Sequence, residues 1–535
     1  MKDIPAARNA GGTPRLRRYH QARWDEPILF ELSAEGERGI LVPTAGPAVR
    51  KAVGDVVASL PAAIRRKTPP ALPEISQNRV LRHYMRLSQE NLGADLNVDV
   101  GQGTCTMKYS PKVNDQLARL HQISELHPLQ AEETLQGILE IMYRFEGFLK
   151  AISGMDAFSL QPGAGSAAIY ANASIMRAYH ASRGEADQRR EIITTIFSHP
   201  SNAACAKTAG FDIVTLYPDE DGYPDLKALK AAVSERTAGL MITNPEDTGI
   251  FNPRIREFVD TVHGVGGLCA YDQANANGIL GVTRARDAGF DLCHFNLHKT
   301  FSTPHGCGGP AGAAVGVTKA LARYLPVPVV VFDGKRYRLD YDRPDSIGKI
   351  GPWYGVAPVI LRAYAWVMSL GADGLREVAR VAVLNNNYLL KKMLEIRGVR
   401  APYAKGKRRI EQVRYSWEEL SRETGVHTED LGLRAADFGV HYWMSHHPWI
   451  VREPCTLEPT ESYSKADLDE YAAIMRHVAQ EARTDPERVK TAPHRSTVHR
   501  IDPSALDDPE QWAVTWRAYR RKLARGSESP GGKTA

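Results

Sequence analysis

The chain has 535 residues, 43% of them hydrophobic and 24% charged, with a formal net charge of +6, and this size and composition predict two or three folded domains rather than a disordered chain. It contains no run of about 18 apolar residues and no apolar signal segment near its start, so neither a membrane-spanning helix nor secretion is expected. Six separated cysteines without a CxxC pair favour neither a zinc site nor a disulfide framework and indicate the cytoplasm, and the small basic excess makes nucleic acid an unexpected partner.

The N-terminal region is predicted to be an extended arm followed by short helices. Residues 1–73 are rich in Pro and Arg and show little hydrophobic periodicity. Apolar residues at helical spacing predict a short helix over Leu81 to Leu92. We therefore assign residues 1–120 to an arm that has no core of its own, and we expect this arm to wrap a neighbouring subunit.

From about residue 154 the pattern alternates between strand and helix. Helical patterns, for example over residues 226–233 and 254–262, separate short apolar or β-branched runs. The predicted strands cover residues 191–197, 211–217, 240–243, 267–271 and 292–297. Alternation of this kind predicts an α/β fold with a mostly parallel sheet and helices on both faces, which we place in a large domain over residues 121–370.

Long helical patterns follow the predicted sheet. They cover Val359 to Leu370 and Leu375 to Arg397. We expect a smaller α+β domain over residues 371–500. Residues 501–535 are predicted to form a basic helix and a disordered polar tail.

A glycine-rich turn lies where an open parallel sheet binds its ligands, at the carboxyl ends of the strands. Gly163, Ala164, Gly165 and Ser166 directly precede a helical stretch. Small residues at a helix N-terminus let backbone N–H groups approach a phosphate, and the helix dipole favours its charge. Such turns are common, however, and most of them bind no anion.

A second turn carries His199 and Asn202 after the strand that ends near Phe197. A histidine at this place could stack on a flat cofactor ring. It could also be a turn residue that hydrogen-bonds to the backbone, and without further context this is the commoner case.

Asp272 and Lys299 each follow an apolar strand, 27 residues apart. A carboxylate buried there requires a cationic partner, and a pyridinium nitrogen would serve; the alternative is a cap for the next helix. A partly desolvated lysine could form a Schiff base, although most lysines simply lie on the surface. His294 and His298 have metal-like spacing, but the segment offers no third ligand, so no metal is expected.

The segment His298 to Pro310, His-Lys-Thr-Phe-Ser-Thr-Pro-His-Gly-Cys-Gly-Gly-Pro, resembles the lysine-bearing signature of glycine decarboxylase, the P-protein of the glycine cleavage system. The likeness extends over about Ile28 to Pro493 and is greatest to the lysine-carrying second subunit of the two-subunit bacterial form. Further matching motifs are Phe30 to Ser33, Arg82 to Tyr84, Cys105 to Tyr109 with Pro111 and Lys112, Ile242 to Pro245, Tyr271 to Asn275, Ser346 to Lys349 and Leu457 to Glu461.

The resemblance implies a fold-type I pyridoxal 5'-phosphate enzyme. By this likeness Lys299 is the aldimine lysine, Asp272 the partner of the pyridine nitrogen and His199 the ring-stacking residue. The other cofactor-binding residues it implies are Gly163, Ala164, Gly165, Ser166, Asn202, Asn244, Ala274 and His298. The implied reaction is decarboxylation of glycine, with transfer of the aminomethyl group to a lipoylated carrier protein. A first decarboxylase subunit is a possible partner, in a homodimer or an α2β2 tetramer.

Several segments depart from the usual family sequence. They are the phosphate turn at Gly163 to Ile169, Val98 to Gln102, Arg409 to Gln412, Cys307 and His441 to Trp443. Cofactor residues are kept while segments expected near the substrate differ, so a paralogous pyridoxal enzyme acting on another amino acid in specialised metabolism is an alternative.

Two further alternatives concern the role of particular residues. A non-catalytic structural subunit is possible in principle, but the intact Lys299 and Asp272 argue against it. Cys105 and Cys307 invite a catalytic or redox role, although two small residues buried near the cofactor are the commoner explanation. The lysine signature favours glycine as the substrate.

Overall fold

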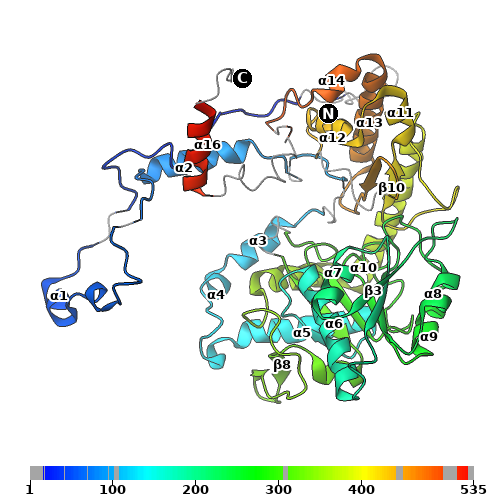
Figure 1. Cartoon of the computed structure of the whole chain (residues 1–535), viewed down its shortest axis with the longest axis horizontal. Helices are drawn as coiled ribbons and strands as arrows, with labels where there is room; N and C mark the ends of the chain where they lie inside the picture. Colours follow the sequence, from blue (N-terminus) through cyan, green and yellow to red (C-terminus); the bar gives the residue numbers. More distant parts are fainter. Residues whose placement is uncertain are drawn as a thin grey trace, which may run out of the picture. The chain divides into compact units, whose positions relative to one another are not determined.

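A computed structural model describes residues 16, 19–40, 43–68, 70–93, 96–101, 108–304, 311–441, 450–497, 500 and 515–527. The chain divides into two units (Figure 1). The first unit comprises Met1–Arg18 and Gly93–Ala492, and the second comprises Tyr19–Leu92 and Pro493–Ala535. Within the described residues, no helix is both long and apolar enough to cross a membrane.

A seven-stranded sheet with the order β1-β7-β6-β5-β4-β2-β3 lies at the centre of the first unit. The strands are β1 (Ala157–Ser159), β2 (Glu191–Thr195), β3 (Asp212–Leu216), β4 (Thr237–Thr243), β5 (Leu268–Asp272), β6 (Leu292–Asn296) and β7 (Ala313–Val317). All run parallel except β7, which pairs antiparallel with both β1 and β6. The predicted α/β fold with a mostly parallel sheet is therefore confirmed.

Helices cover both faces of this sheet because its strands are apolar on both sides. Along β4, Leu240 and Ile242 belong to one buried cluster and Met241, between them, belongs to another. Successive side chains of a strand point to opposite faces, so the sheet carries a core on each. The surrounding helices are α5 (Gln136–Ser153), α6 (Gly165–Ser182), α7 (Ser201–Thr208), α8 (Leu226–Ala232) and α9 (Ile255–His263).

A long helix, α10 (Ala357–Leu394), links the core of the sheet to a second core in the same unit. The sequence predicts two helices here, and the break falls at Gly371, whose φ of 63° is non-helical. The second core belongs to a smaller α+β region formed by β10 (Val413–Ser416), β11 (Pro454–Leu457), α11 (Glu418–Thr424), α12 (Thr428–Ala436), α13 (Lys465–Thr484) and α14 (Pro486–Lys490). Strands β10 and β11 pair antiparallel.

Shorter elements complete the first unit. They are α3 (Lys112–Ala118), α4 (His121–Ser124) and the antiparallel pair β8 (Val329–Phe332) and β9 (Tyr337–Asp340).

The second unit joins the N-terminal arm to residues from the far end of the chain. It contains α1 (Pro47–Val53), α2 (Gln77–Gln89) and α16 (Trp516–Ser527). The backbone N–H of Gln21 donates to the carbonyl of Arg495 at 3.1 Å, and the rings of Phe30 and Trp516 stack with centroids 4.9 Å apart. None of the residues of α1 is buried.

Candidate active site

The predicted site residues follow the carboxyl ends of strands that run in the same direction. The glycine turn follows β1, His199 follows β2, Asn244 follows β4, Asp272 ends β5 and Lys299 follows β6. Because parallel strands end at one edge of the sheet, their topology brings these residues to a common edge.

Asp272 lies at the centre of this edge and is only 3% exposed. Its Oδ2 accepts a hydrogen bond from Nδ2 of Asn202 at 2.8 Å, and its Oδ1 accepts one from the N–H of Ala274 at 3.0 Å. Burial by itself would raise the pKa of Asp272, but His294 and these hydrogen bonds lower it below the usual value. The side chain is therefore a buried carboxylate.

His294 is the neighbour of Asp272 on β6, with Nε2 at 3.2 Å from Oδ1. Burial lowers the pKa of His294 more than the adjacent Asp272 raises it, so the ring is neutral at pH 7 and lowers the pKa of Asp272 only where it is protonated, at acidic pH. Among the described residues, no lysine or arginine forms an ion pair with Asp272. A buried carboxylate without a fixed cation fits the protonated nitrogen of a pyridine ring.

The glycine turn opens helix α6, which begins at Gly165 and has no acidic residue in its first turn. A side chain at Gly165 would place its Cβ 2.5 Å from Nδ2 of Asn296 at the end of β6, so the Asn296 side chain would have to move to accept any other residue there. The Oγ atoms of Ser166 and Ser201 lie 3.0 Å apart, which places hydroxyls at the starts of α6 and α7. Backbone N–H groups, a helix dipole and hydroxyls together suit a phosphate.

His199 is half-buried, and its backbone carbonyl accepts hydrogen bonds from Asn202. Its Nδ1 accepts from the N–H of Ser201 at 3.1 Å, which orients the ring. His199 also contributes to the low pKa of Asp272, so the two side chains share one electrostatic environment.

The segment around Lys299 is held by several hydrogen bonds. Lys299 is 8% exposed, and its N–H donates to the carbonyl of Asn296 at 3.1 Å. The next residue, Thr300, accepts from the N–H of Ala276 through Oγ1 at 2.8 Å. Its carbonyl accepts from Nζ of Lys108 at 2.8 Å. The backbone that carries Lys299 is thus tied to the segments on both sides of it.

Asn244 and His298 use their side chains to bind neighbouring loops. The amide oxygen of Asn244 accepts from the N–H of Asn252 at 2.8 Å, and its Nδ2 donates to the Asn252 carbonyl at 3.3 Å. Nδ1 of His298 lies 3.1 Å from the carbonyl of Gly312. Their role toward a cofactor stays a prediction.

A buried ion pair beside Lys299 was not assigned a role from sequence. Nζ of Lys108 lies 2.9 Å from Oε1 of Glu461, and the Lys108 side chain is 1% exposed. Burial lowers the pKa of Lys108 more than Glu461 raises it. Both residues lie in motifs that carry the family likeness, and this was the only sequence signal for them.

Two buried carboxyl groups, Glu411 and Glu458, lie close to the same segment. Oε1 of Glu458 accepts from Nδ2 of Asn275 at 2.7 Å. Burial and the charge of Glu458 raise the pKa of Glu411 well above its usual value, so Glu411 is protonated. Glu411 belongs to the segment Arg409 to Gln412, where this sequence departs from the usual family sequence. That departure therefore includes a residue that is buried near the sheet edge.

Two other features lie apart from this edge. His263, Cys269 and Asp291 have potential ligand atoms within 4.8 Å of one another near the amino ends of β5 and β6. An ion pair from Nε2 of His263 to Asp291 at 2.7 Å and a hydrogen bond from the N–H of Cys269 at 2.8 Å account for this group. Burial also raises the pKa of Cys269 well above its usual value, which keeps it a thiol.

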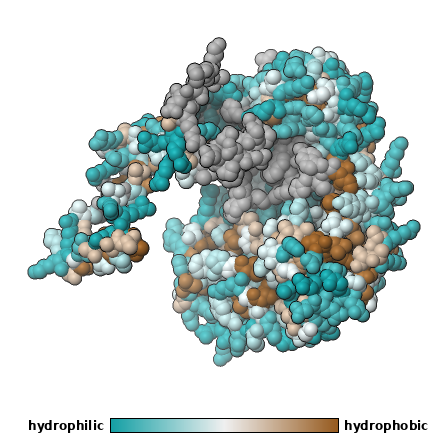
Figure 2. Space-filling view, in the orientation of Figure 1, coloured by the Kyte–Doolittle hydropathy of each residue, from teal (hydrophilic) through white to brown (hydrophobic). Residues whose placement is uncertain are grey.

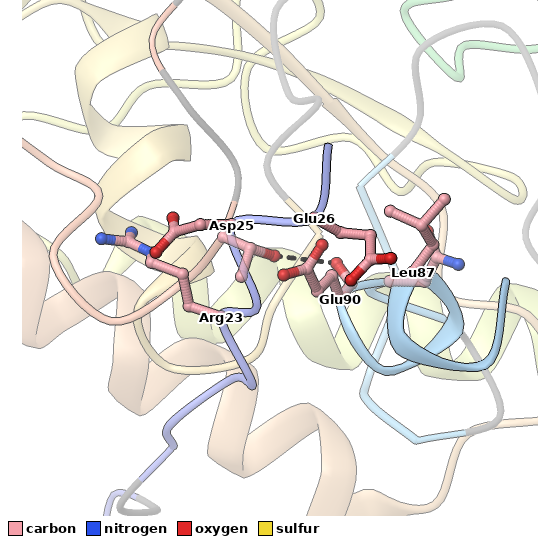
Figure 3. Close-up of a pocket in the computed structure, with 7 residues that line it drawn as sticks. Arg23, Asp25, Glu26, Leu87 and Glu90 are labelled. Atoms are coloured by element: carbon pink, nitrogen blue, oxygen red, sulfur yellow. Dashed lines mark hydrogen bonds between the residues drawn. The ribbon is translucent and has the colours of Figure 1, made fainter. Parts of the chain in front are cut away.

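A pocket of about 530 Å³ in the second unit contains none of the predicted site residues (Figure 3). Its polar groups already have partners in the second unit: Glu26 pairs with Arg86 at 3.0 Å, and Oγ1 of Thr497 donates to the carbonyl of Glu90 at 2.9 Å. These contacts hold the second unit together. Cys105, Cys307 and the segment at 442–443 lie outside the described residues.

Comparison with known proteins agrees with this geometry. The family described as aminotransferase class-V matches residues 166–317, and the family described as glycine dehydrogenase, C-terminal domain, matches residues 378–499. A crystal structure of glycine decarboxylase (P-protein) of the glycine cleavage system, in inhibitor-bound form, aligns with a TM-score of 0.68 at 20% identity over 82% of this chain and 100% of that one. A sphingosine-1-phosphate lyase from Burkholderia pseudomallei aligns with a TM-score of 0.57 at 14% identity over 81% of this chain and 96% of that one.

Sequence relatives extend over nearly the full chain. A protein from Pyrococcus abyssi named probable glycine dehydrogenase (decarboxylating) subunit 2 is 46% identical over 510 residues, which is 95% of this chain and 99% of that protein. A protein of the same name from Caldanaerobacter subterraneus is 42% identical over 481 residues, which is 89% of this chain and 96% of that protein.

Proposed function

This chain belongs to the glycine dehydrogenase (decarboxylating) subunit 2 family, and on that premise we propose that it is the pyridoxal-phosphate subunit that decarboxylates glycine and passes the aminomethyl group to a lipoylated carrier protein. The observation that carries the proposal is the 46% identity over 95% of the chain to a relative of that name. The class-V aminotransferase match supports the same chemistry.

The residues at the sheet edge are suited to hold the cofactor. Lys299 would bind it covalently, Asp272 would pair with its ring nitrogen, His199 would stack on its ring, and the turn at residues 163–166 would take its phosphate. When bound, pyridoxal phosphate supplies an electron sink for the pair left on the α-carbon of glycine as CO2 departs.

The protein's own contribution is to fix charge and orientation. Asn202 and the N–H of Ala274 hold both oxygens of Asp272, so its carboxylate stays ionised and in place. Lys108 and Ala276 hold Thr300, so the backbone of Lys299 is fixed as well. Preorganised charges of this kind avoid the cost of reorganising during the reaction.

The two sequence relatives are named glycine dehydrogenases, which favours glycine as the substrate over the different amino acid that a paralogue would use. The departures at residues 166–169, 98–102 and 410 then indicate weaker binding of glycine rather than a different substrate. A missing polar contact in a site can reduce discrimination strongly.

We infer a partner subunit from the words "subunit 2" in the names of the relatives. The second unit supports this inference, because it exposes many large apolar side chains, seen as tan and brown atoms near α1 in Figure 2. They include Val49, Val53, Val57, Leu60 and Ile64, of which Ile64 is 73% exposed. Apolar surface of this kind usually marks an interface, and we propose an α2β2 tetramer or a homodimer in the cytoplasm. A clean monomer by light scattering, with the first subunit present, would contradict the assembly.

An exchange assay tests the proposed activity. The protein, the first subunit, lipoylated carrier and glycine are mixed with carbon-labelled bicarbonate, and label entering glycine is followed. We expect exchange that requires the carrier and is lost in Lys299→Arg. No exchange, together with an absorbance change on another amino acid, would contradict the proposal and favour the paralogue.

A further inference from the structure

A basic groove of about 800 Å³ lies between the last turns of α10 and the loop that follows it. Leu390, Leu394 and Val399 form its apolar part. The described residues that line it include no Asp or Glu, whereas its cationic side chains are Lys391, Arg400, Lys405, Lys407, Arg408 and Arg409. The groove therefore combines positive charge with an apolar surface.

The loop that forms the groove is held in one conformation by Arg409, which is 2% exposed. Its guanidinium donates to the carbonyls of Pro402, Tyr403, Ala404 and Lys407 at 2.8–3.3 Å. Tyr403 and Ala404 have φ angles of 62° and 35°. Non-glycine residues keep this left-handed conformation only where the surrounding structure enforces it, and such strain gathers at functional sites. The groove is therefore preformed.

Three of the cations are available to a partner. Arg400 already pairs with Glu419 at 2.8 Å, and Nζ of Lys407 donates to the hydroxyl of Tyr223 at 3.2 Å. Within the described part of the chain, no carboxylate forms an ion pair with Lys391, Lys405 or Arg408, and all three are exposed. Unpaired surface cations around an apolar patch suit a surface of opposite charge.

The groove adjoins the candidate active site. Tyr403 packs against Phe197, two residues before His199, with ring centroids 5.7 Å apart. The N–H of Ile410 donates to the carbonyl of Gly249 at 2.9 Å, in the loop that follows Asn244. Tyr403 in the groove wall and Ile410, which directly follows the lining residue Arg409, thus contact two of the loops at the carboxyl edge of the sheet.

We propose that this groove docks an acidic, carboxylate-rich surface of the protein that accepts the aminomethyl group. The inference rests on the proposed function, because the carrier must bring its arm to this edge of the sheet in every turnover. Asp and Glu side chains of the carrier pair with Lys405 and Arg408, and an apolar side chain covers Leu394, which is 48% exposed. Attraction between opposite charges speeds association and weakens as salt is added.

The test compares two variants with the same change in charge. The first is Lys405→Glu with Arg408→Glu, and the control is Lys319→Glu with Lys335→Glu, two exposed lysines that lie shortly after β7 and β8. Lys391 is left unchanged because a positive charge in the last turn of a helix stabilises that helix. The glycine–bicarbonate exchange is measured against the concentration of lipoylated carrier, at low and at high salt, with the holoenzyme and the first subunit.

We expect the groove variant to raise the KM for the carrier about tenfold or more. Its kcat, its absorbance change with glycine and its melting temperature stay as in the wild type, and the control keeps the wild-type KM. The KM of the wild type rises with salt more steeply than that of the groove variant. Normal exchange with an unchanged KM, or an equal rise in the control, overturns the docking site alone. No exchange by the wild type overturns the proposed function, and the docking site with it.

Discussion

Asn202 donates a hydrogen bond of 2.8 Å to Oδ2 of Asp272, although the two residues are 70 positions apart in the chain. The contact joins the start of α7 to the end of β5. It holds one oxygen of the carboxylate while the N–H of Ala274 holds the other. Both contacts favour the ionised form of Asp272 and so prepare it for a cationic partner.

Replacing Asp272 with Asn should preserve the shape of the site and remove its charge. A hydrogen bond to a charged group contributes about 1.5–3 kcal/mol, so affinity for pyridoxal phosphate should fall roughly tenfold or more, and exchange activity should fall further. Cofactor binding to the apoprotein is measured by fluorescence titration and activity by label exchange. An unchanged rate would show that Asp272 does not act on the ring nitrogen.

Lys299 should be the residue that binds the cofactor covalently. Treating the holoprotein with borohydride and digesting it should yield a peptide around Lys299 with the reduced cofactor attached. Lys299→Arg keeps the positive charge but should yield no such peptide, and it serves as the matched control. Mass spectrometry that finds the cofactor on another lysine would refute the assignment.

The ion pair between Lys108 and Glu461 should stabilise the fold only when it is complete. Replacing Lys108 with Met leaves a carboxylate without its buried partner, and breaking such a pair costs about 3–5 kcal/mol. Adding Glu461→Gln to this variant should recover much of the loss, because no charge then remains unpaired. Urea unfolding of the apoprotein measures both effects. A double variant as unstable as the single one would exclude a specific pair.

Glu246 should make the protein less stable as the pH rises through neutrality. Burial raises its pKa from the usual 4.5 to about 8, with a smaller contribution from Asp247. The unfolded chain therefore loses this proton at lower pH than the folded protein, so stability falls between about pH 4.5 and 8, by about 3 kcal/mol at pH 7.

The variant Glu246→Gln should remove this dependence and raise the melting temperature at pH 7, with little effect near pH 4.5. Glu220→Gln, at an exposed position in the turn after β3, is the control and should change neither. Melting temperatures are compared from pH 5 to 8. A constant difference between Glu246→Gln and the wild type over this range would contradict a raised pKa.

Local sequence patterns predicted strands β2 to β6 closely because each is a short apolar run between polar turns, whereas β1 and β7 were not predicted. Residues 267–271 were predicted as a strand and form β5 at Leu268–Asp272. Contacts between distant segments could not be predicted in this way. Lys108 precedes all the strands of the sheet in the sequence and Glu461 follows them all. Nothing local to either residue indicates that the two meet. The strain at Tyr403 likewise depends on Arg409, whose guanidinium donates to the carbonyl of Tyr403.

The second unit combines residues from both ends of the chain, and this has a consequence for protein synthesis. The side chain of Gln21 accepts hydrogen bonds from Ser496 and Thr497, more than 470 residues further along the chain. Domains usually fold as they leave the ribosome, N-terminal parts first. Here the arm at residues 19–92 is translated first but lacks these contacts until the first unit has been made. The hydrogen bonds between Gln21 and residues 496–497 can therefore form only after the whole first unit has been translated, so the second unit is completed last.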